Sequence, residues 1–202
     1  MEDKQLPVHL EGSFDSIYGN FGYRFAALLL DGIILAPMTI GFLFYNSLNL
    51  NNVYVGILVS NVINIFYHIY FPTRFGATPG KLALGLHILK MNGDTITYSD
   101  AFRRYLPNLL LGLIAIINTL FAVSKADANH YNDLSWIKQS EYLQSLNSNM
   151  FSIQMICINA FFFTSFIIFM LNERKRSISD LSGDTAVVKK YYLKQIKEVM
   201  KK

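Results

Sequence analysis

The sequence has little of what soluble or secreted domains rely on. Charged residues make up only 16% of the 202 residues, against about 25% in an average soluble domain. Cys157 is the single cysteine, which excludes an intrachain disulfide and suggests a small apolar core residue. The four histidines lack metal-ligand spacing, and no serine stands in a nucleophile-elbow pattern. We therefore expect no metal site, no cofactor and no enzyme activity.

What the chain has instead is long apolar stretches. Hydrophobic residues make up 52% of it and gather in four blocks of about 20 residues, the length that crosses a hydrocarbon core of about 30 Å. The blocks cover residues 25–45, 52–72, 106–124 and 151–171. No basic segment leads into a cleavable signal peptide, so the first block is expected to be an uncleaved anchor. The sequence predicts an all-α membrane protein with four transmembrane helices.

Lysine and arginine are unevenly distributed between the connecting segments. The turn 46–51 has none, the loop 73–105 has five, the loop 125–150 has two and the segment 172–202 has nine. Positive charge stays on the cytoplasmic side of a membrane. We therefore expect a multi-pass protein of the cytoplasmic membrane, with both termini and the loop 73–105 inside and the loop 125–150 outside. Topology explains this charge better than nucleic-acid binding does.

Three regions follow from this pattern. They are a cytoplasmic N-terminal segment at 1–23, a four-helix membrane domain at 24–190 and a basic tail at 191–202. The tail is amphipathic, which is typical of a helix that lies on the anionic inner leaflet. A solvated tail or a partner-binding helix is the alternative.

The loop 73–105 contains a glycine-rich stretch, Gly76–Lys81. It resembles a phosphate-binding loop, but the spacing is one residue short and Leu82 stands where Ser or Thr must bind magnesium. A tight turn at the membrane interface, with Lys81 near lipid headgroups, is the better interpretation.

Three short β-prone runs accompany this turn. Residues 82–89 and 95–97 flank Asn92-Gly93, which is a hairpin signal, and 185–188 form the third run. A small cytoplasmic sheet built from the loop and the tail is therefore expected. Ser99 is the predicted N-cap of the helix that leads into the third span.

Several of these elements occur in the order found in one family. They are Arg24 within Gly22–Ala27, Asp31, the stretch Gly76–Lys81 followed by Leu84-Gly85, and Asp180 within 174–185. Over about 20–190 the chain resembles the RDD family of small bacterial and archaeal membrane proteins, named for one arginine and two aspartates. The resemblance implies no agreed catalytic residues. Some members are linked to transport or sodium/proton exchange, and others resemble accessory proteins. The loop 125–150 and the tail are longer than a minimal member needs.

The charged residues on which the family resemblance rests need partners in the folded protein. A carboxylate within hydrocarbon costs roughly 2.5–3.5 kcal/mol, so Asp31 must face a partner or a water-filled cavity. Arg24 and Asp31 share a helix face but lie roughly 10 Å apart along the axis, so each is expected to find another partner. We predict that Asp180 docks beside Arg24. Further candidates for the charge network are Arg103, Arg104 and Asp184.

A polar stripe runs along the second block. Asn61, Asn64 and His68 are spaced i, i+3, i+7 and share one face, which is expected to point at the bundle interior, with Asp31 as a candidate neighbour. Asn118, Gln154 and Asn159 add polar groups in the third and fourth blocks. These residues either line a pathway or form interhelical hydrogen bonds, which contribute about 0.6 kcal/mol each.

Two functions remain open. The first is a small ion or solute transporter, for instance a monovalent cation/proton exchanger, with Asp31 as its membrane-embedded carboxylate. Four spans are few for a solitary transporter, so this function requires a homo-oligomer or another membrane protein. The second is a non-catalytic accessory or regulatory subunit that binds a membrane protein or lipid, in which the Arg24, Asp31 and Asp180 set only determines the fold.

Overall fold

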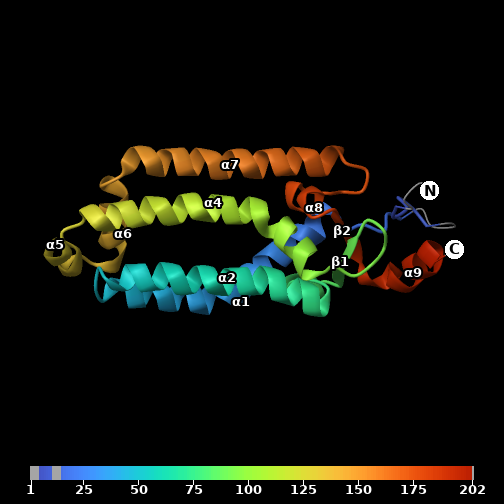
Figure 1. The fold of residues 1–202 in the computed structure, drawn as a ribbon, viewed down its shortest axis with the longest axis horizontal. Coiled ribbons are helices and arrows are strands. Elements are labelled where there is room, and N and C mark those ends of the chain that lie inside the picture. Colours follow the sequence, from blue (N-terminus) through green and yellow to red (C-terminus); the bar gives the residue numbers. More distant parts are fainter. Residues whose placement is uncertain (1–4, 11–14, 202) are drawn as a thin grey trace. The chain divides into compact units, whose positions relative to one another are not determined.

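The computed structural model describes residues 5–10 and 15–201 (Figure 1). Residues 1–4 and 11–14 of the predicted N-terminal segment, and Lys202 of the predicted tail, lie outside the described residues. The chain forms two compact units. Unit 1 comprises the described parts of 1–34, 65–107 and 163–202, and unit 2 comprises 35–64 and 108–162.

Four long helices confirm the four predicted blocks. They are α1 (Phe21–Ser47), α2 (Asn52–Phe75), α4 (Tyr98–Lys125) and α7 (Ser148–Leu171). Each is long and apolar enough to cross a membrane. Their apolar side chains remain largely uncovered by protein; Leu58 and Phe163, for example, are each 69% exposed. A helix that is apolar on its uncovered face fits a hydrocarbon environment, where its backbone hydrogen bonds are satisfied internally.

Unit 1 contains a two-stranded antiparallel sheet. Strand β1 (Leu86–Lys90) pairs with β2 (Thr185–Lys189), so that Leu86 lies opposite Lys189 and Lys90 opposite Thr185. A sheet built from the loop and the tail segment is thereby confirmed. The predicted hairpin between 82–89 and 95–97 is wrong as a pair of strands. Among the described residues, the two runs are joined by a single isolated β-bridge, between Leu89 and Thr95. The chain turns into α4 directly after this bridge, and β2 takes the role of the pairing strand.

Both faces of this sheet are buried. Successive side chains of a strand point to opposite faces, and Val187 packs with Leu86 and Ile88 on one face, while Ala186 and Val188 belong to a second apolar cluster on the other. The first cluster includes Ala27 of α1, and the second includes Leu6 and Ile17 of the N-terminal segment. A two-stranded hairpin alone is marginally stable, so this double burial holds the sheet together.

The N-terminal segment also contributes to this core, a role that the sequence pattern did not predict. The backbone N–H of Gly19 donates to the carbonyl of Val187 at 3.0 Å, and the N–H of Lys189 donates to the carbonyl of Ile17 at 2.9 Å. Residues 17–19 therefore run along the free edge of β2. The few apolar residues of this segment stand among polar ones without periodicity, so the pattern gave no signal.

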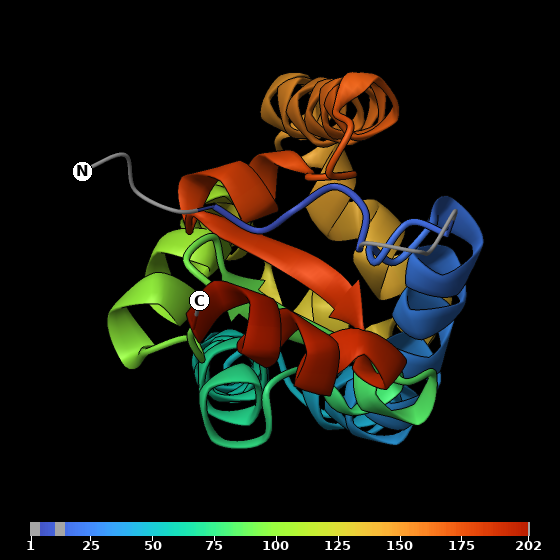
Figure 2. The same cartoon turned by 90° about the vertical axis from the view of Figure 1, so that its right-hand side faces the viewer.

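The tail forms a helix packed on the sheet. After the 3-10 turn Lys190–Tyr192 comes α9 (Leu193–Lys201), which lies beside β2 in Figure 2. Ile196 is fully buried, and Leu193 and Met200 pack against the same cluster. The apolar face that was expected to meet the lipid leaflet thus packs against the protein's own core, and the exposed residues of α9 include Lys194 and Lys197.

The start of α4 differs from the prediction by two residues. Thr97, not Ser99, precedes the helix. Its Oγ1 accepts from the Asp100 N–H at 3.4 Å, while Asp100 Oδ2 accepts from the Thr97 N–H at 2.8 Å. This reciprocal pattern is a capping box with aspartate in place of glutamate. Asp100 also pairs with Lys90 at 3.2 Å, which fixes the helix start against β1.

Four short helices complete the described fold. In unit 1 they are α3 (Pro79–Ala83) and α8 (Ile178–Ser182), and in unit 2 they are α5 (Ala128–Asp133) and α6 (Trp136–Ser145). Two of them therefore lie within the predicted loop 125–150. Asp127 Oδ1 accepts from the His130 N–H at 3.0 Å and caps α5.

Truncation of Ile196 tests whether α9 is part of the core. Ile196→Ala removes buried methyl groups and should lower the free energy of unfolding of unit 1 by about 2–5 kcal/mol. Lys194→Ala, on the exposed face of the same helix, is the matched control and should change it little. The measurement is hydrogen exchange of the β2 amides in detergent. Equal protection of these amides in both variants would contradict a packed α9.

Candidate functional site

Asp31 is buried within α1 and accepts three short hydrogen bonds. Its Oδ1 accepts from Tyr67 Oη of α2 at 2.6 Å and from the backbone N–H of Gly80 at 2.7 Å. Its Oδ2 accepts from Thr78 Oγ1 at 2.7 Å. The donors come from α2 and from the α3 segment, so a single carboxylate holds three elements of unit 1 together. Hydrogen bonds to an ionised group are among the stronger ones in proteins.

Lys81, which was predicted to lie near lipid headgroups, completes this site through contacts with Thr78 and Asp31. Its Nζ donates to Thr78 Oγ1 at 3.2 Å and lies 3.9 Å from Asp31 Oδ2. The α3 turn folds back onto α1, so the ammonium points at the carboxylate. Burial, together with the nearby charge of Arg104, lowers the pKa of Lys81 to about 8, although the charge of Asp31 acts in the opposite direction. Lys81 therefore holds its proton less firmly near neutral pH than an ordinary lysine does.

Gly80 permits this close approach. A Cβ built on Gly80 would lie 2.7 Å from the Asp31 backbone nitrogen and would overlap the carbonyl oxygen of Ala27. Neither backbone group can move without displacing α1. Pro79 at the first turn of α3 presets the helical φ angle, so the sequence Thr78-Pro79-Gly80-Lys81 turns tightly against α1.

A single methyl group at position 80 should therefore open the site. We expect Gly80→Ala to destabilise unit 1 by about 1–3 kcal/mol through overpacking, measured as a shift of the thermal unfolding midpoint in detergent. Gly32→Ala is the matched control, since a Cβ at Gly32 meets nothing within 4 Å, and alanine is favoured over glycine within a helix by roughly 0.5–1 kcal/mol. Equal midpoints for the two variants would show that α3 does not rest on α1.

Asp180 forms the second charged centre of unit 1. It is fully buried in α8, and its Oδ2 pairs with Arg24 Nη1 at 2.5 Å while its Oδ1 pairs with Arg104 Nη1. The predicted contact between Asp180 and Arg24 is present, and Arg104, one of the two further arginines predicted, is also a partner. Asp180 Oδ2 accepts in addition from the Ser177 N–H at 2.9 Å and closes a capping box.

Two guanidinium groups decide the charge of Asp180. Burial by itself raises the pKa of this carboxyl, but the charges of Arg104 and Arg24 outweigh burial and hold the pKa well below its ordinary value. Asp180 is therefore ionised across the physiological range. A buried carboxylate with two arginines is a fixed structural ion cluster, because removal of the carboxylate leaves two buried positive charges without a partner.

Arg24 connects this cluster to two further segments. Its Nε donates to the Gly19 carbonyl at 3.0 Å, and its guanidinium lies 5.0 Å from the ring centroid of Phe169 in α7. Its Nη2 is buried and has no hydrogen-bond partner among the described residues. The aromatic face supplies a cation–π contact in its place.

The two variants of this cluster should differ in stability. Asp180→Asn leaves two guanidinium groups facing each other and should cost about 3–5 kcal/mol, whereas Arg24→Gln should cost less, because Arg104 still neutralises Asp180. Asp184→Asn is a control for an exposed carboxylate and should cost about 1 kcal/mol or less. The measurement is denaturant unfolding in detergent. A larger loss for Arg24→Gln than for Asp180→Asn would contradict this assignment.

The same cluster predicts a pH dependence of stability. The pKa of Asp180 is lower in the folded protein than in the unfolded chain. Its contribution is therefore complete above the unfolded pKa of about 3.9 and is lost progressively as the pH falls below that value. Asp180→Asn should lack this acid-sensitive component in the same unfolding measurement.

The other predicted charge partners lie elsewhere. Within the described residues, Arg103 makes no ion pair with either aspartate, and its backbone carbonyl accepts from Ser182 Oγ at 2.7 Å. Asp184 pairs with Arg176 at 2.9 Å and not with Arg24. Adjacent residues of a helix point in different directions, so only one of Arg103 and Arg104 in α4 can face α8. The structure shows that this residue is Arg104.

Within the described residues, no side chain of the predicted polar stripe of α2 hydrogen-bonds to Asp31, its candidate neighbour. Asn61 and Asn64 donate to the carbonyls of Ile57 and Ser60 in their own helix, at 2.8 and 2.9 Å. His68 stacks on the Tyr105 ring at 5.2 Å between centroids. The α2 donor to Asp31 is Tyr67, one position away from the stripe. Its phenol is long enough to reach the carboxylate, which the spacing of smaller polar residues did not reveal.

In unit 2, amides link different helices. Asn118 Nδ2 donates to Gln154 Oε1 at 2.8 Å, and Asn118 Oδ1 accepts from Asn147 Nδ2 at 2.6 Å. Asn159 donates to the Met155 carbonyl within α7 at 2.8 Å. The Asn118 contacts are those expected of interhelical hydrogen bonds.

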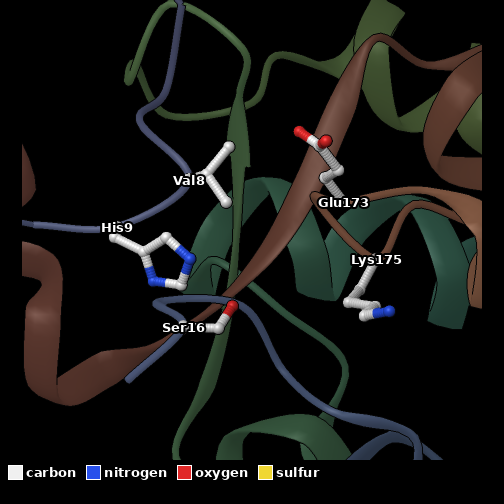
Figure 3. Close-up of a pocket in the computed structure, with 5 residues that line it drawn as sticks. All are labelled: Val8, His9, Ser16, Glu173 and Lys175. Carbon is white, nitrogen blue, oxygen red and sulfur yellow. The ribbon is translucent and has the colours of Figure 1, made fainter. Parts of the chain in front are cut away.

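No other described feature offers a stronger site. No group of three or more His, Cys, Asp or Glu among the described residues is arranged to hold a metal ion. Figure 3 shows a hollow with Val8, His9 and Ser16 of the N-terminal segment on one side and Glu173 and Lys175 on the other. Neither Asp31 nor Asp180 lines it. The Asp31–Lys81 pair therefore remains the candidate site.

Comparison with known protein families identifies a match over most of the chain. A model of the RDD family matches residues 18–184, a range that includes Arg24, Asp31, Lys81 and Asp180. No curated protein and no solved structure that was compared matches the chain significantly.

Proposed function

Since the chain belongs to the RDD family of membrane proteins, we propose that it exchanges a monovalent cation for a proton at the Asp31–Lys81 pair. The observation that carries the proposal is the position of Lys81 Nζ, 3.9 Å from Asp31 Oδ2 and 3.2 Å from Thr78 Oγ1. The ammonium thus occupies a place between two oxygen atoms. Asp31 is also the only Asp or Glu in the four apolar blocks of the sequence, where a carboxylate is expensive and typically functional.

The proposed exchange balances charge at the site. Protonated Lys81 neutralises Asp31. When Lys81 releases its proton, the carboxylate loses its counter-ion, and a monovalent cation takes the vacated place on Asp31 Oδ2 and Thr78 Oγ1. Hard cations prefer such oxygen ligands. Rebinding of a proton by Lys81 then expels the cation, so that one proton is exchanged for one cation.

The proposal includes an orientation and an assembly. The lysine and arginine counts favour a cytoplasmic location for the sheet of unit 1 and for both termini. Asp31 and Lys81 would then face a path from the cytoplasm. Four spans leave little room for a complete pathway, so we propose a homo-oligomer or a complex with another membrane protein.

A second candidate function rests on a different observation. All three short hydrogen bonds to Asp31 come from this chain's own residues, and Asp180 is held by two of its own arginines. Both aspartates would serve in this case only to fix the fold of a non-transporting accessory or regulatory subunit. The two candidates differ in whether the Lys81 ammonium can be replaced by a free cation.

Proteoliposomes with an internal pH dye test this difference. Sodium or potassium gradients should drive proton movement through the wild-type protein and through Lys90→Gln, which removes a lysine from a different ion pair. Asp31→Asn should abolish the movement. Lys81→Gln should retain cation binding, measured calorimetrically with sodium chloride, but lose cation-driven proton movement, because the titrating group is gone.

The pH dependence gives the sharper criterion. Lys81, whose pKa is about 8, competes for Asp31 only while it is protonated. The apparent cation affinity should therefore rise as the pH increases through about 8, and this rise should be absent in Lys81→Gln. Absence of flux and of cation binding in folded wild-type protein would overturn the exchange proposal and favour the accessory function.

A further inference from the structure

Helix α6 is attached to unit 2 along one side only. Gln139 is buried, and its Nε2 donates to the Ser47 carbonyl at the end of α1 at 3.1 Å and to the Tyr131 carbonyl at 3.0 Å. Tyr142 and Leu143 pack against the apolar cluster formed by Leu50, Val53, Val123 and Tyr131. The helix is therefore fixed where α1 ends, α2 begins and α4 ends.

The apolar surface of α6 continues beyond this contact. Trp136 and Ile137, in its first turn, are 55% and 53% exposed. Trp136 and Leu143 are seven residues apart and share a helix face, yet only Leu143 is packed against the cluster. On the remaining side, Lys138 and Glu141 are exposed. The helix thus presents a covered face, an uncovered apolar edge and a charged side.

The position of this edge indicates what covers it. Helix α6 lies where α1 ends and α2 begins, and apolar side chains near that end of α2, such as Val55, are themselves uncovered. The exposed edge of α6 is therefore at the level where the spanning helices leave the hydrocarbon. Tryptophan has an apolar ring system and a single N–H donor, and it concentrates at the boundary between hydrocarbon and headgroups. Short amphipathic helices lie in that boundary with their apolar edge toward the acyl chains.

We infer that α6 is an interfacial helix, with Trp136 and Ile137 inserted at the lipid headgroup boundary. The partner of this surface is the bilayer itself, and its charged side faces water. The inference does not depend on cation exchange. It depends only on the membrane location of the long helices.

The sequence provides a direct probe, because Trp136 is the only tryptophan. In proteoliposomes, its fluorescence should be quenched by phospholipids brominated near the headgroup end of the acyl chain more strongly than by lipids brominated near the chain end. Two reference variants calibrate depth. Trp136→Phe combined with Phe162→Trp reports an exposed position within α7, and Trp136→Phe combined with Tyr191→Trp reports an exposed position next to α9.

The expected order places Trp136 between the two references. It should be quenched by aqueous acrylamide less than Trp at 191 and by deep bromine less than Trp at 162. Acrylamide quenching equal to that at 191, with no effect of brominated lipid, would overturn the inference in favour of a water-exposed helix. Protection from every quencher, relieved when the protein is diluted in lipid, would overturn it in favour of a contact with a second copy.

Discussion

The structure of unit 1 depends on the requirement that buried carboxylates find donors. Asp31 and Asp180 are both withdrawn from water, and an unpaired charge in that environment would change its protonation or unfold its surroundings. Each aspartate therefore collects partners from elements that are distant in sequence. Asp31 joins α1 to α2 and α3, and Asp180 joins α8 to α1 and α4. The sheet is packed between segments that these two carboxylates position.

The sequence predicted the helices and the contacts between distant segments only where it carried a strong pattern. Four apolar blocks of membrane length predicted α1, α2, α4 and α7, and the family pattern predicted the pairing of Arg24 with Asp180. The partners of Asp31 gave no such signal. Gly80 acts through its backbone N–H, and Tyr67 and Thr78 are residue types common in any span or turn. Their roles follow from the closeness of α3 to α1, which depends on the absence of a side chain at position 80.

The ends of the chain illustrate the same limit. The basic, amphipathic tail predicted a helix correctly but did not identify what its apolar face meets. Ile196 and Leu193 contact the sheet cluster, whereas the same amphipathic pattern is equally typical of a helix on lipid. An amphipathic pattern predicts that the apolar face of a helix is buried. Only the tertiary structure shows whether protein or lipid buries it. Residues 17–19 are a stronger case, because they pair with β2 through backbone hydrogen bonds, which leave no periodic pattern of side chains in so short a segment.

The two aspartates differ in a way that bears on the proposed exchange. Asp180 is held by two guanidinium groups, which stay protonated in proteins, so its counter-charges cannot be released by a change of pH. Asp31 is held by three neutral donors and one ammonium that stands 3.9 Å from it. Loss of the Lys81 proton changes the charge of this site while the three neutral hydrogen bonds keep α1, α2 and α3 in place. In the proposed exchange, a cation would then replace the ammonium without dismantling the fold, whereas at Asp180 the same replacement would require a buried arginine to leave. This contrast is the physical reason to assign exchange to Asp31 and structural support to Asp180.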